Sequence, residues 1–335
     1  MTKGQYSVSD AVLKKPDLLE REETVLRDIT KRSGFEAEKR LGDSRYWTRD
    51  FAGAVFYLGK YQGKAAVLKI QGTKPPIAEI DQIENFAAQN QSQVIRPPKL
   101  YGYLKWDETN KYEALFLEEV EGKPIVSCPT NGEELKEFFE LYQEYRQNCL
   151  IKPWLPKPEL TLPEIIEADF NNWRLIAKKL YPVHPLRKAN DAGLIGVVVA
   201  KLKNEYQAYE PQFIHGHFSY LDLLKTKSGE VILFSNLFWK YKAPWYDSVF
   251  GQHWFRYRLS SIKEIAPKEV EAQRELWLKE IWALAQNEED KKLINLALLE
   301  RAAAGLNLDA LSVDPKIPIT EYLVEATRQE VKRLL

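Results

Sequence analysis

The chain has 335 residues, of which 44% are hydrophobic, and it carries 48 Lys+Arg against 48 Asp+Glu. This length and composition allow one large core or two smaller ones. The formal net charge is zero, so no basic surplus indicates binding to nucleic acid or to anionic lipid.

Sequence features that direct a protein to export or to a membrane are not found. The first residues, MTKGQYSVSDAVLKK, lack the apolar core of a signal peptide, and the apolar run LIGVVVA (194–200) is too short to span a bilayer. The two cysteines, Cys128 and Cys149, form neither a disulfide framework nor a metal-binding spacing. We therefore expect a cytoplasmic protein, with no membrane and no nucleic acid among its partners.

Residues 1–45 are predicted to form a helical extension. Apolar residues recur at helical spacing between 7 and 40. This pattern predicts one or two helices that are broken near Pro16 and end before Gly34.

Residues 46–121 have the pattern of a small sheet with one helix. Strands are predicted at 53–59 and 64–71, around a Gly-containing turn, and at 99–105 and 112–119, around the turn DETN. Pro75 and Pro76 open a predicted helix at 77–90.

Residues 122–335 are predicted to be mostly helical. Helices are expected at 132–148, 162–180, 192–208 and 267–286, with smaller helices to the C-terminus. The exception is a hairpin of strands 221–226 and 230–234 around the turn Lys227-Ser228-Gly229. A small sheet followed by a larger helical part with an inserted hairpin predicts an α+β, two-lobed fold.

The hairpin lies in a distinctive stretch, FIHGHFSYLDLLKTKSGEVILFSNLF (213–238), which is followed by Tyr246-Asp247. With Lys69 at the end of AAVLK, this order resembles the aminoglycoside phosphotransferase and choline kinase family of the protein-kinase-like fold. Family members carry a loop H-G-D-x-x-x-x-N, two aliphatic residues, a hairpin, a metal-binding Asp and a later Y-D pair. His215-Gly216 and Leu223-Leu224 match this order, and the resemblance covers roughly residues 46–260.

The resemblance implies a bilobal protein-kinase-like fold whose small lobe contacts a nucleotide. Lys69 would hold the nucleotide phosphates, and an acidic residue on the next helix would pair with it. The family's spacing to the following proline favours Glu84, whereas Glu79 shares a helical face with the apolar residues of that helix. Glu118 lies where the hinge of the family begins, and Val120 follows it. The implied cofactor is ATP or another nucleotide, with or without Mg²⁺.

Three positions depart from the family pattern. His217 replaces the catalytic Asp, Asp222 replaces the metal-binding Asn, and Ser235 replaces the metal-binding Asp. A neutral imidazole can accept a proton near pH 7 and a carboxylate can bind Mg²⁺, so the first two changes keep some chemistry. The serine hydroxyl is a poor substitute for the charge that bridges the metal to the phosphoryl group.

The phosphate loop also departs from the family. The family usually carries several small residues before Lys69, whereas Gly53 is the only glycine of the stretch SRYWTRDFAGA. Arg45 and Arg49 are either replacements for that loop by direct charge or ordinary surface residues.

These departures predict a pseudokinase, that is, a scaffold with a degenerate catalytic site that binds a nucleotide, another small molecule or an unidentified protein partner. A lost base alone costs about 10² to 10⁴ in rate. The alternative is a divergent ATP-dependent small-molecule phosphotransferase with His217 as base and Asp222 as metal ligand. A zinc pair of His215 and His217 is a weaker alternative, since no third ligand is evident nearby, and His215 is more simply a structural residue of the loop.

A third interpretation is an interaction module whose cleft is filled by aromatic side chains. Rings gather between Trp239 and Tyr257, within and after KYKAPWYD, where family members position substrate. Packing into the helical lobe is the simpler role for these rings, although some of them are also expected to line a ligand site.

Overall fold

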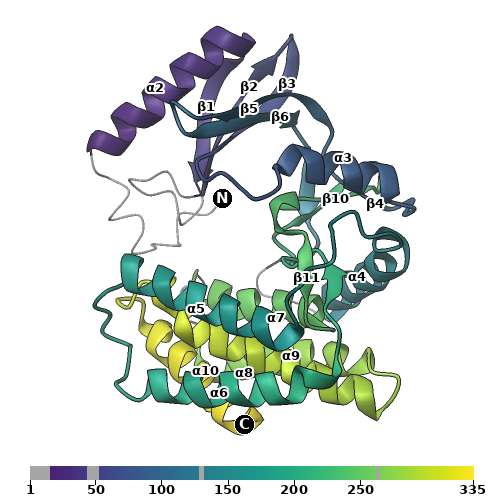
Figure 1. Ribbon diagram of the computed structural model, residues 1–335, viewed down its shortest axis with the longest axis vertical. Coiled ribbons are helices and arrows are strands. Elements are labelled where there is room, and N and C mark those ends of the chain that lie inside the picture. The colour runs from purple at the N-terminus through teal and green to yellow at the C-terminus, as the bar shows by residue number, and fades with distance from the viewer. Residues whose placement is uncertain (1–15, 44–52, 128–131, 262–264) are drawn as a thin grey trace. The chain divides into compact units, whose positions relative to one another are not determined.

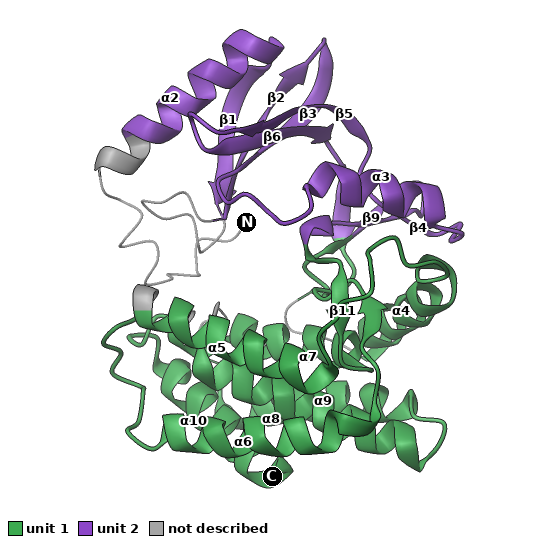
Figure 2. Ribbon diagram, in the orientation of Figure 1, with its two compact units in different colours: residues 1–8, 124–223, 238–335 green, residues 9–123, 224–237 purple. Residues whose placement is uncertain are grey.

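The structure is a computed structural model that describes residues 16–43, 53–127, 132–261 and 265–335. Its described residues form two compact units (Figure 2). One, here called the sheet unit, contains the described residues before Pro124 together with 224–237. The other, here called the helical unit, contains the remaining described residues.

The sheet unit is built from the elements of the first third of the chain and the hairpin. In chain order these are α2 (Pro16–Ser33), β1 (Glu36–Asp43), β2 (Ala54–Tyr61), β3 (Lys64–Gln71), α3 (Glu79–Gln89), β4 (Ile95–Arg96), β5 (Leu100–Asp107), β6 (Tyr112–Glu118), β7 (Gly122–Pro124), β9 (Leu223–Thr226) and β10 (Val231–Leu233). An antiparallel sheet runs in the order β1-β2-β3-β6-β5, and α2 lies beside it (Figure 1). Val25 and Ile29 of α2 pack into the apolar core of the sheet with Leu68 and Phe116.

The predicted strands and turns of this unit are confirmed. The first hairpin turns at Gln62 and Gly63, both with positive φ (52° and 76°), as a two-residue hairpin loop requires. The helix predicted at 77–90 is α3.

The helical prediction for the N-terminal extension is only partly correct. α2 ends before Gly34 as expected, and Gly34 takes the left-handed φ (70°) typical of a residue that follows a helix. Residues 36–40, however, belong to β1, which pairs with β2 at the sheet edge. Its side chains are mostly exposed, so the sequence shows no alternation there, and backbone pairing alone defines the strand. Residues 1–15 lie outside the described residues.

The second hairpin is confirmed, but it groups with the sheet unit and not with the helices. Thr226 N donates to Glu230 O at 2.9 Å, and Gly229 has φ 92° in the turn. Val231 and Ile232 pair in parallel with β4, giving a small sheet in the order β4-β10-β9-β7. Because β10 pairs with β4, a strand far away in the sequence, the hairpin belongs to the sheet unit.

The helical unit contains long helices and a two-stranded sheet. Its main elements are α4 (Gly132–Glu144), a π-helical turn (Tyr145–Cys149), α5 (Leu162–Leu180), α6 (Asp191–Glu205), β8 (Gln212–Ile214), β11 (Lys240–Lys242), α7 (Tyr246–Arg258), α8 (Pro267–Ala283), α9 (Glu288–Asn307) and α10 (Pro318–Leu334). The expectation of smaller helices at the C-terminus is wrong, because α9 and α10 have 20 and 17 residues. α9 packs against α5, α6, α7 and α10 and is buried on most sides, so it lacks the single apolar stripe that reveals a surface helix. None of the described helices combines the length and apolar content needed to cross a membrane.

Candidate functional site

The loop from His215 to Asp222 leaves β8, which pairs with β11 through Ile214 and Lys240. Gly216 has φ 76°, and a Cβ there would lie 2.7 Å from Lys240 Cε and 2.8 Å from Phe238 O. Only glycine fits this position without displacing the Phe238 carbonyl and the Lys240 side chain. The matched H-G dipeptide therefore has a local structural reason.

The base of the loop is held by a buried carboxylate, Asp247 of the Y-D pair. Asp247, in the first turn of α7, accepts hydrogen bonds from Gly216 N (3.2 Å) and from the Tyr145 hydroxyl (2.9 Å). The same hydroxyl accepts from His215 N at 2.6 Å. Burial raises the pKa of Asp247, and these hydrogen bonds partly oppose that shift. No motif or spacing in the sequence indicates this role of Tyr145, because the residue belongs to a π-helical turn.

His215 lies in the interior of the helical unit. Its ring is fully buried and meets Trp239 edge to face, with centroids 4.9 Å apart. Its backbone N–H holds the Tyr145 hydroxyl. This position gives His215 a structural role in the loop, while its catalytic role remains a prediction.

His217 and Asp222 contact each other directly. His217 Nδ1 lies 2.8 Å from Asp222 Oδ2, and Ser219 Oγ donates to the same oxygen at 2.5 Å. Burial would raise the pKa of Asp222, but the two histidines of the loop and Ser219 outweigh it and lower the pKa. An ionised carboxylate only accepts hydrogen bonds, so Nδ1 carries the proton and Nε2 is the basic nitrogen. The side chain of His217 is 26% exposed.

Aromatic rings enclose the His217 imidazole. Phe238 stacks on it with centroids 4.5 Å apart and a 16° interplanar angle, and Phe250 approaches at 4.6 Å. Phe238 is itself 40% exposed. Most of the predicted aromatic cluster is buried in the helical unit, which confirms the packing interpretation for these rings: Trp239, Tyr246, Phe250, Phe255 and Tyr257.

A charged network lies next to the loop. Lys242 is completely buried and pairs with Asp169 (2.6 Å) and Glu300 (2.5 Å). Lys240, which covers Gly216, forms no ion pair with a carboxylate of the described residues, and its ammonium lies 5.7 Å from the Tyr246 ring centroid. Burial lowers the pKa of Lys240, opposed by Asp169 and assisted by Lys242. Lys240 therefore lies beside the loop with no ion-pair partner among the described residues.

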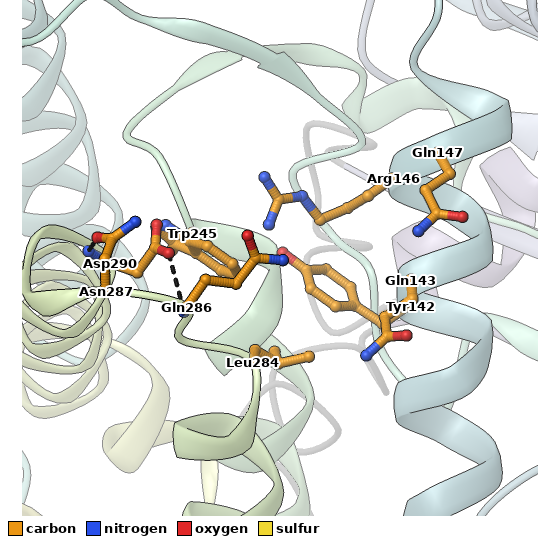
Figure 3. Close-up of a pocket in the computed structure, with 9 residues that line it drawn as sticks. All are labelled: Tyr142, Gln143, Arg146, Gln147, Trp245, Leu284, Gln286, Asn287 and Asp290. Atoms are coloured by element: carbon orange, nitrogen blue, oxygen red, sulfur yellow. Dashed lines mark hydrogen bonds between the residues drawn. The ribbon is translucent and has the colours of Figure 1, made fainter.

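Trp245, from the segment KYKAPWYD, lines a pocket of about 440 Å³ in the helical unit (Figure 3). Arg146 of the π-helical turn lies over its ring, 4.0 Å from the centroid. Trp245 has a left-handed φ of 64°, which is uncommon for a bulky residue and sets the direction of the indole. Asp290 faces the same pocket and accepts from Gln286 N at 3.0 Å. Trp245 is thus one ring of the predicted cluster that lines a pocket, and a ligand-binding role of these rings stays a prediction.

In the sheet unit, Lys69 on β3 is 8% exposed and forms an ion pair with Glu79 in the first turn of α3. The structure thus decides between the two alternatives in favour of Glu79. Glu84, assigned to this site by family spacing, is exposed. The correction has a simple cause, because Glu79 shares the buried face of α3 with Ile83 and Phe86.

A second carboxylate, missed by the sequence analysis, lies close to this pair. Glu113 sits on β6 two residues from the partner of Lys69, on the same face of the sheet. Burial first, and then Glu79, raise its pKa to about 7, against the opposing effect of Lys69. Its Oε1 has no hydrogen-bond partner among the described residues. The Lys69 ammonium therefore interacts with two buried carboxyl groups, those of Glu79 and Glu113.

The remaining predicted cofactor residues lie at the ends of strands. Glu118 is buried and its carboxylate accepts from the Arg96 guanidinium and from Lys99 N (2.8 Å), so it braces the end of β6. Val120 follows β6 and is half-buried. Ser235 follows β10 with a left-handed φ of 61°. Nucleotide contacts of Glu118 and Val120, and a metal role of Ser235, remain predictions.

Part of the predicted site falls elsewhere. Arg45, Arg49 and most of the phosphate-loop stretch lie outside the described residues. Across the described ranges, no group of three or more His, Cys, Asp or Glu side chains is placed to hold a metal ion.

An antiparallel sheet with the helices α2 and α3, a hairpin and a larger set of helices defines an α+β protein of the protein-kinase-like class. Solved structures of three phosphotransferases have this fold. Aminoglycoside phosphotransferase APH(4)-Ia superposes with a TM-score of 0.59 at 10% identity, over 93% of this chain and 98% of that one. A microcompartment-associated aminopropanol kinase gives 0.60 at 11% identity, over 93% and 100%. A choline/ethanolamine kinase family protein from Mesorhizobium loti gives 0.51 at 11%, over 95% and 94%.

These likenesses confirm the predicted fold class and, at the level of the fold, the resemblance to aminoglycoside phosphotransferases and choline kinases. At such identities they show the fold alone. No protein-family model matches the sequence, and no curated protein matches it.

Proposed function

We propose that the chain is a pseudokinase, a kinase-like scaffold that binds an anionic small molecule without efficient phosphoryl transfer. The bond between His217 and Asp222 carries this proposal. It joins the residue at the family's base position to the residue at its metal position. Because Asp222 Oδ2 accepts from both His217 and Ser219, a metal ion would have to compete with two existing hydrogen bonds for that oxygen.

The expected loss of rate is large. A misplaced base costs about 10² to 10⁴, and a missing metal ligand adds several kcal/mol of unstabilised transition state. From a typical starting rate of roughly 10 s⁻¹, a combined loss of about 10⁵ leaves one turnover every few hours. Such a rate does not support metabolism.

Two features support an anionic ligand. Lys69 keeps an acidic partner on α3, as the phosphate-holding lysine of the family does, and Lys240 is a cation beside the loop with no acidic partner among the described residues. Nucleotides are the first ligands to test, because APH(4)-Ia was solved with ADP or AMP-PNP together with hygromycin B, and amicoumacin kinase with AMP-PNP and Ca²⁺.

The same bond favours a second candidate, a divergent phosphotransferase. A buried carboxylate that receives the Nδ1 proton of a histidine leaves Nε2 as a general base, the arrangement used in Ser-His-Asp enzymes. In this candidate His217 is the base and Asp222 orients it, so Asp222 is no longer the metal ligand that the sequence suggested.

The two candidates are separated by binding and turnover measured on the same preparation. Thermal shifts with ATP, ADP and AMP-PNP are recorded with and without Mg²⁺, and mass spectrometry follows phosphate transfer to amino alcohols and aminoglycosides. A pseudokinase should show nucleotide shifts that do not depend on Mg²⁺, since binding to the folded state raises stability by mass action. Its turnover should stay below about one per hour.

Turnover faster than about once per minute that His217→Ala abolishes would establish the second candidate instead. A complete absence of nucleotide shifts would refute the nucleotide as ligand and leave a different small molecule or a protein partner.

A further inference from the structure

A pocket of about 730 Å³ lies within the helical unit and is lined by residues of α5, of α6, of the segment that joins them and of the end of α9. Its apolar lining consists mainly of small or aliphatic residues: Ala177, Pro182, Ala192, Ile195, Val199 and Leu306. Gly196 of α6 also lines it, and a Cβ there would meet no atom within 4 Å. Sites of this volume and apolar lining take small molecules that have an extended apolar part.

The polar lining of this pocket is dominated by cations. Arg174, Lys178 and Arg187 line it and form no ion pair with any carboxylate in the described parts of the chain, while the lining Lys188 pairs with Glu325 at 2.7 Å. All three residues are exposed to solvent, so their positive charge is accessible to an anion that binds in the pocket.

The two acids that line the pocket are already paired. Asp191 accepts from Arg328 at 2.7 Å and 3.0 Å, and Glu167 pairs with Lys203. Neither carboxylate therefore neutralises the cations of the pocket.

His184 lines the same pocket with a buried ring. It is 7% exposed and its Nδ1 accepts from Leu186 N at 3.2 Å, so the neutral ring carries its proton on Nε2. Burial and then Arg187 lower the pKa of His184, which favours this neutral form. No described residue accepts a hydrogen bond from Nε2.

We propose that this pocket binds an anion with an apolar tail, that is, a medium-chain carboxylate or alkyl phosphate. Arg174, Lys178 and Arg187 contact the charged head, and the tail lies over the small residues of α6 at Gly196. The proposal does not depend on the pseudokinase assignment, because the pocket shares no residue with the loop from His215 to Asp222.

Isothermal titration of the full chain tests the ligand chemistry with four probes: decanoate, decyl phosphate, decanol and inorganic phosphate, each below its micelle concentration. Decanoate or decyl phosphate should bind at least about tenfold more tightly than decanol and than inorganic phosphate, a difference of about 1.4 kcal/mol. If decanol bound as tightly as the two tailed anions, the cations would have no role in binding and the proposal would be wrong. If inorganic phosphate bound as tightly as the tailed anions, the apolar tail would have no role in binding and the proposal would be wrong. Absence of binding by both tailed anions would also overturn the proposal.

Two glycines of one helix give a matched pair of variants. Gly196→Leu places a side chain in the pocket, whereas Gly193→Leu adds the same side chain to α6 outside the lining residues, and open space surrounds both positions. Gly196→Leu should weaken decanoate binding at least about tenfold while Gly193→Leu leaves it unchanged. If Gly196→Leu does not fold, the double variant Arg174→Gln/Arg187→Gln is tested in its place, and the same tenfold loss of decanoate affinity is expected. Unaltered binding in the pocket variant that folds would refute the site.

Discussion

His217 Nδ1 lies 2.8 Å from Asp222 Oδ2, so two residues that both depart from the kinase-like motif complete each other's hydrogen bonding. A carboxylate at 222 is costly in a buried loop unless a donor faces it. His217 and Ser219 supply those donors. The two substitutions therefore form one unit, and changing either alone should be worse than changing both.

A double-mutant cycle tests this coupling. His217→Asp alone should lower the free energy of unfolding by roughly 2 kcal/mol, because it sets a second carboxylate against Asp222. His217→Asp/Asp222→Asn, which restores the family's pair, should recover most of that loss. Urea unfolding of the unaltered protein, the two single variants His217→Asp and Asp222→Asn, and the double variant measures the coupling free energy. Additive effects of the two single changes would contradict the coupling.

Adding Ser235→Asp to that pair should make nucleotide binding sensitive to Mg²⁺. The triple variant has the family's catalytic Asp at position 217 and its metal-binding Asn and Asp at positions 222 and 235, and these last two supply oxygen ligands of the kind that Mg²⁺ prefers. We expect the thermal shift with AMP-PNP to grow on addition of Mg²⁺ in the triple variant and not in the unaltered protein. Equal shifts with and without the metal in both proteins would count against the family alignment of these positions.

Lys69 should stabilise the sheet unit through Glu79. Lys69→Met removes the cation that serves Glu79 and Glu113, and it should cost about 3 kcal/mol of unfolding free energy, as does the breaking of other buried pairs. Lys69→Met/Glu79→Gln should recover part of this loss. Lys64→Met, at an exposed position of the same strand, is the control, and a loss as large there would show that the pair is not the cause.

The raised pKa of Glu113 predicts a stability change near neutral pH. The folded state holds this proton up to about pH 7, against an ordinary value of 4.5. The penalty for burying a charged Glu113 is therefore absent below about pH 4.5, and it lowers the free energy of unfolding progressively as the pH rises to 7. Glu113→Gln should exceed the unaltered protein in stability by roughly 1–2 kcal/mol at pH 8, with allowance for solvent screening, and match it near pH 4. Thermal unfolding at both pH values checks the sign, and a pH-independent difference would exclude this titration.

The Tyr145 hydroxyl should be needed for the stability of the loop. Tyr145→Phe removes a donor to Asp247 and an acceptor of His215 N, both buried, and should cost about 2–3 kcal/mol. Tyr103→Phe, at an exposed ring, should cost less than about 0.5 kcal/mol. Equal effects of the two changes, measured by urea unfolding, would show that the hydroxyl bridge contributes little.

Local patterns in the sequence were sufficient for much of the fold. The hairpins at Gln62-Gly63 and at Gly229 follow from alternating apolar residues around turn residues that tolerate positive φ. The end of α2 follows from Gly34 for a similar reason. The order of the H-G dipeptide, the aliphatic pair and the Y-D pair also located the loop and its brace on Asp247. These features depend on neighbouring residues, so they can be read along the chain.

Other features were decided only by packing across distant segments. β1 has mostly exposed side chains and exists because its backbone pairs with β2, and α9 is buried on most sides and so shows no single apolar stripe. Lys69 pairs with Glu79 and not Glu84 because the buried face of α3 carries the former. The bond from His217 to Asp222 depends on how the loop bends over five residues, and the cations of the α5–α6 pocket converge from separate segments. Periodicity and spacing describe one element at a time, whereas these contacts depend on the directions in which several elements present their side chains.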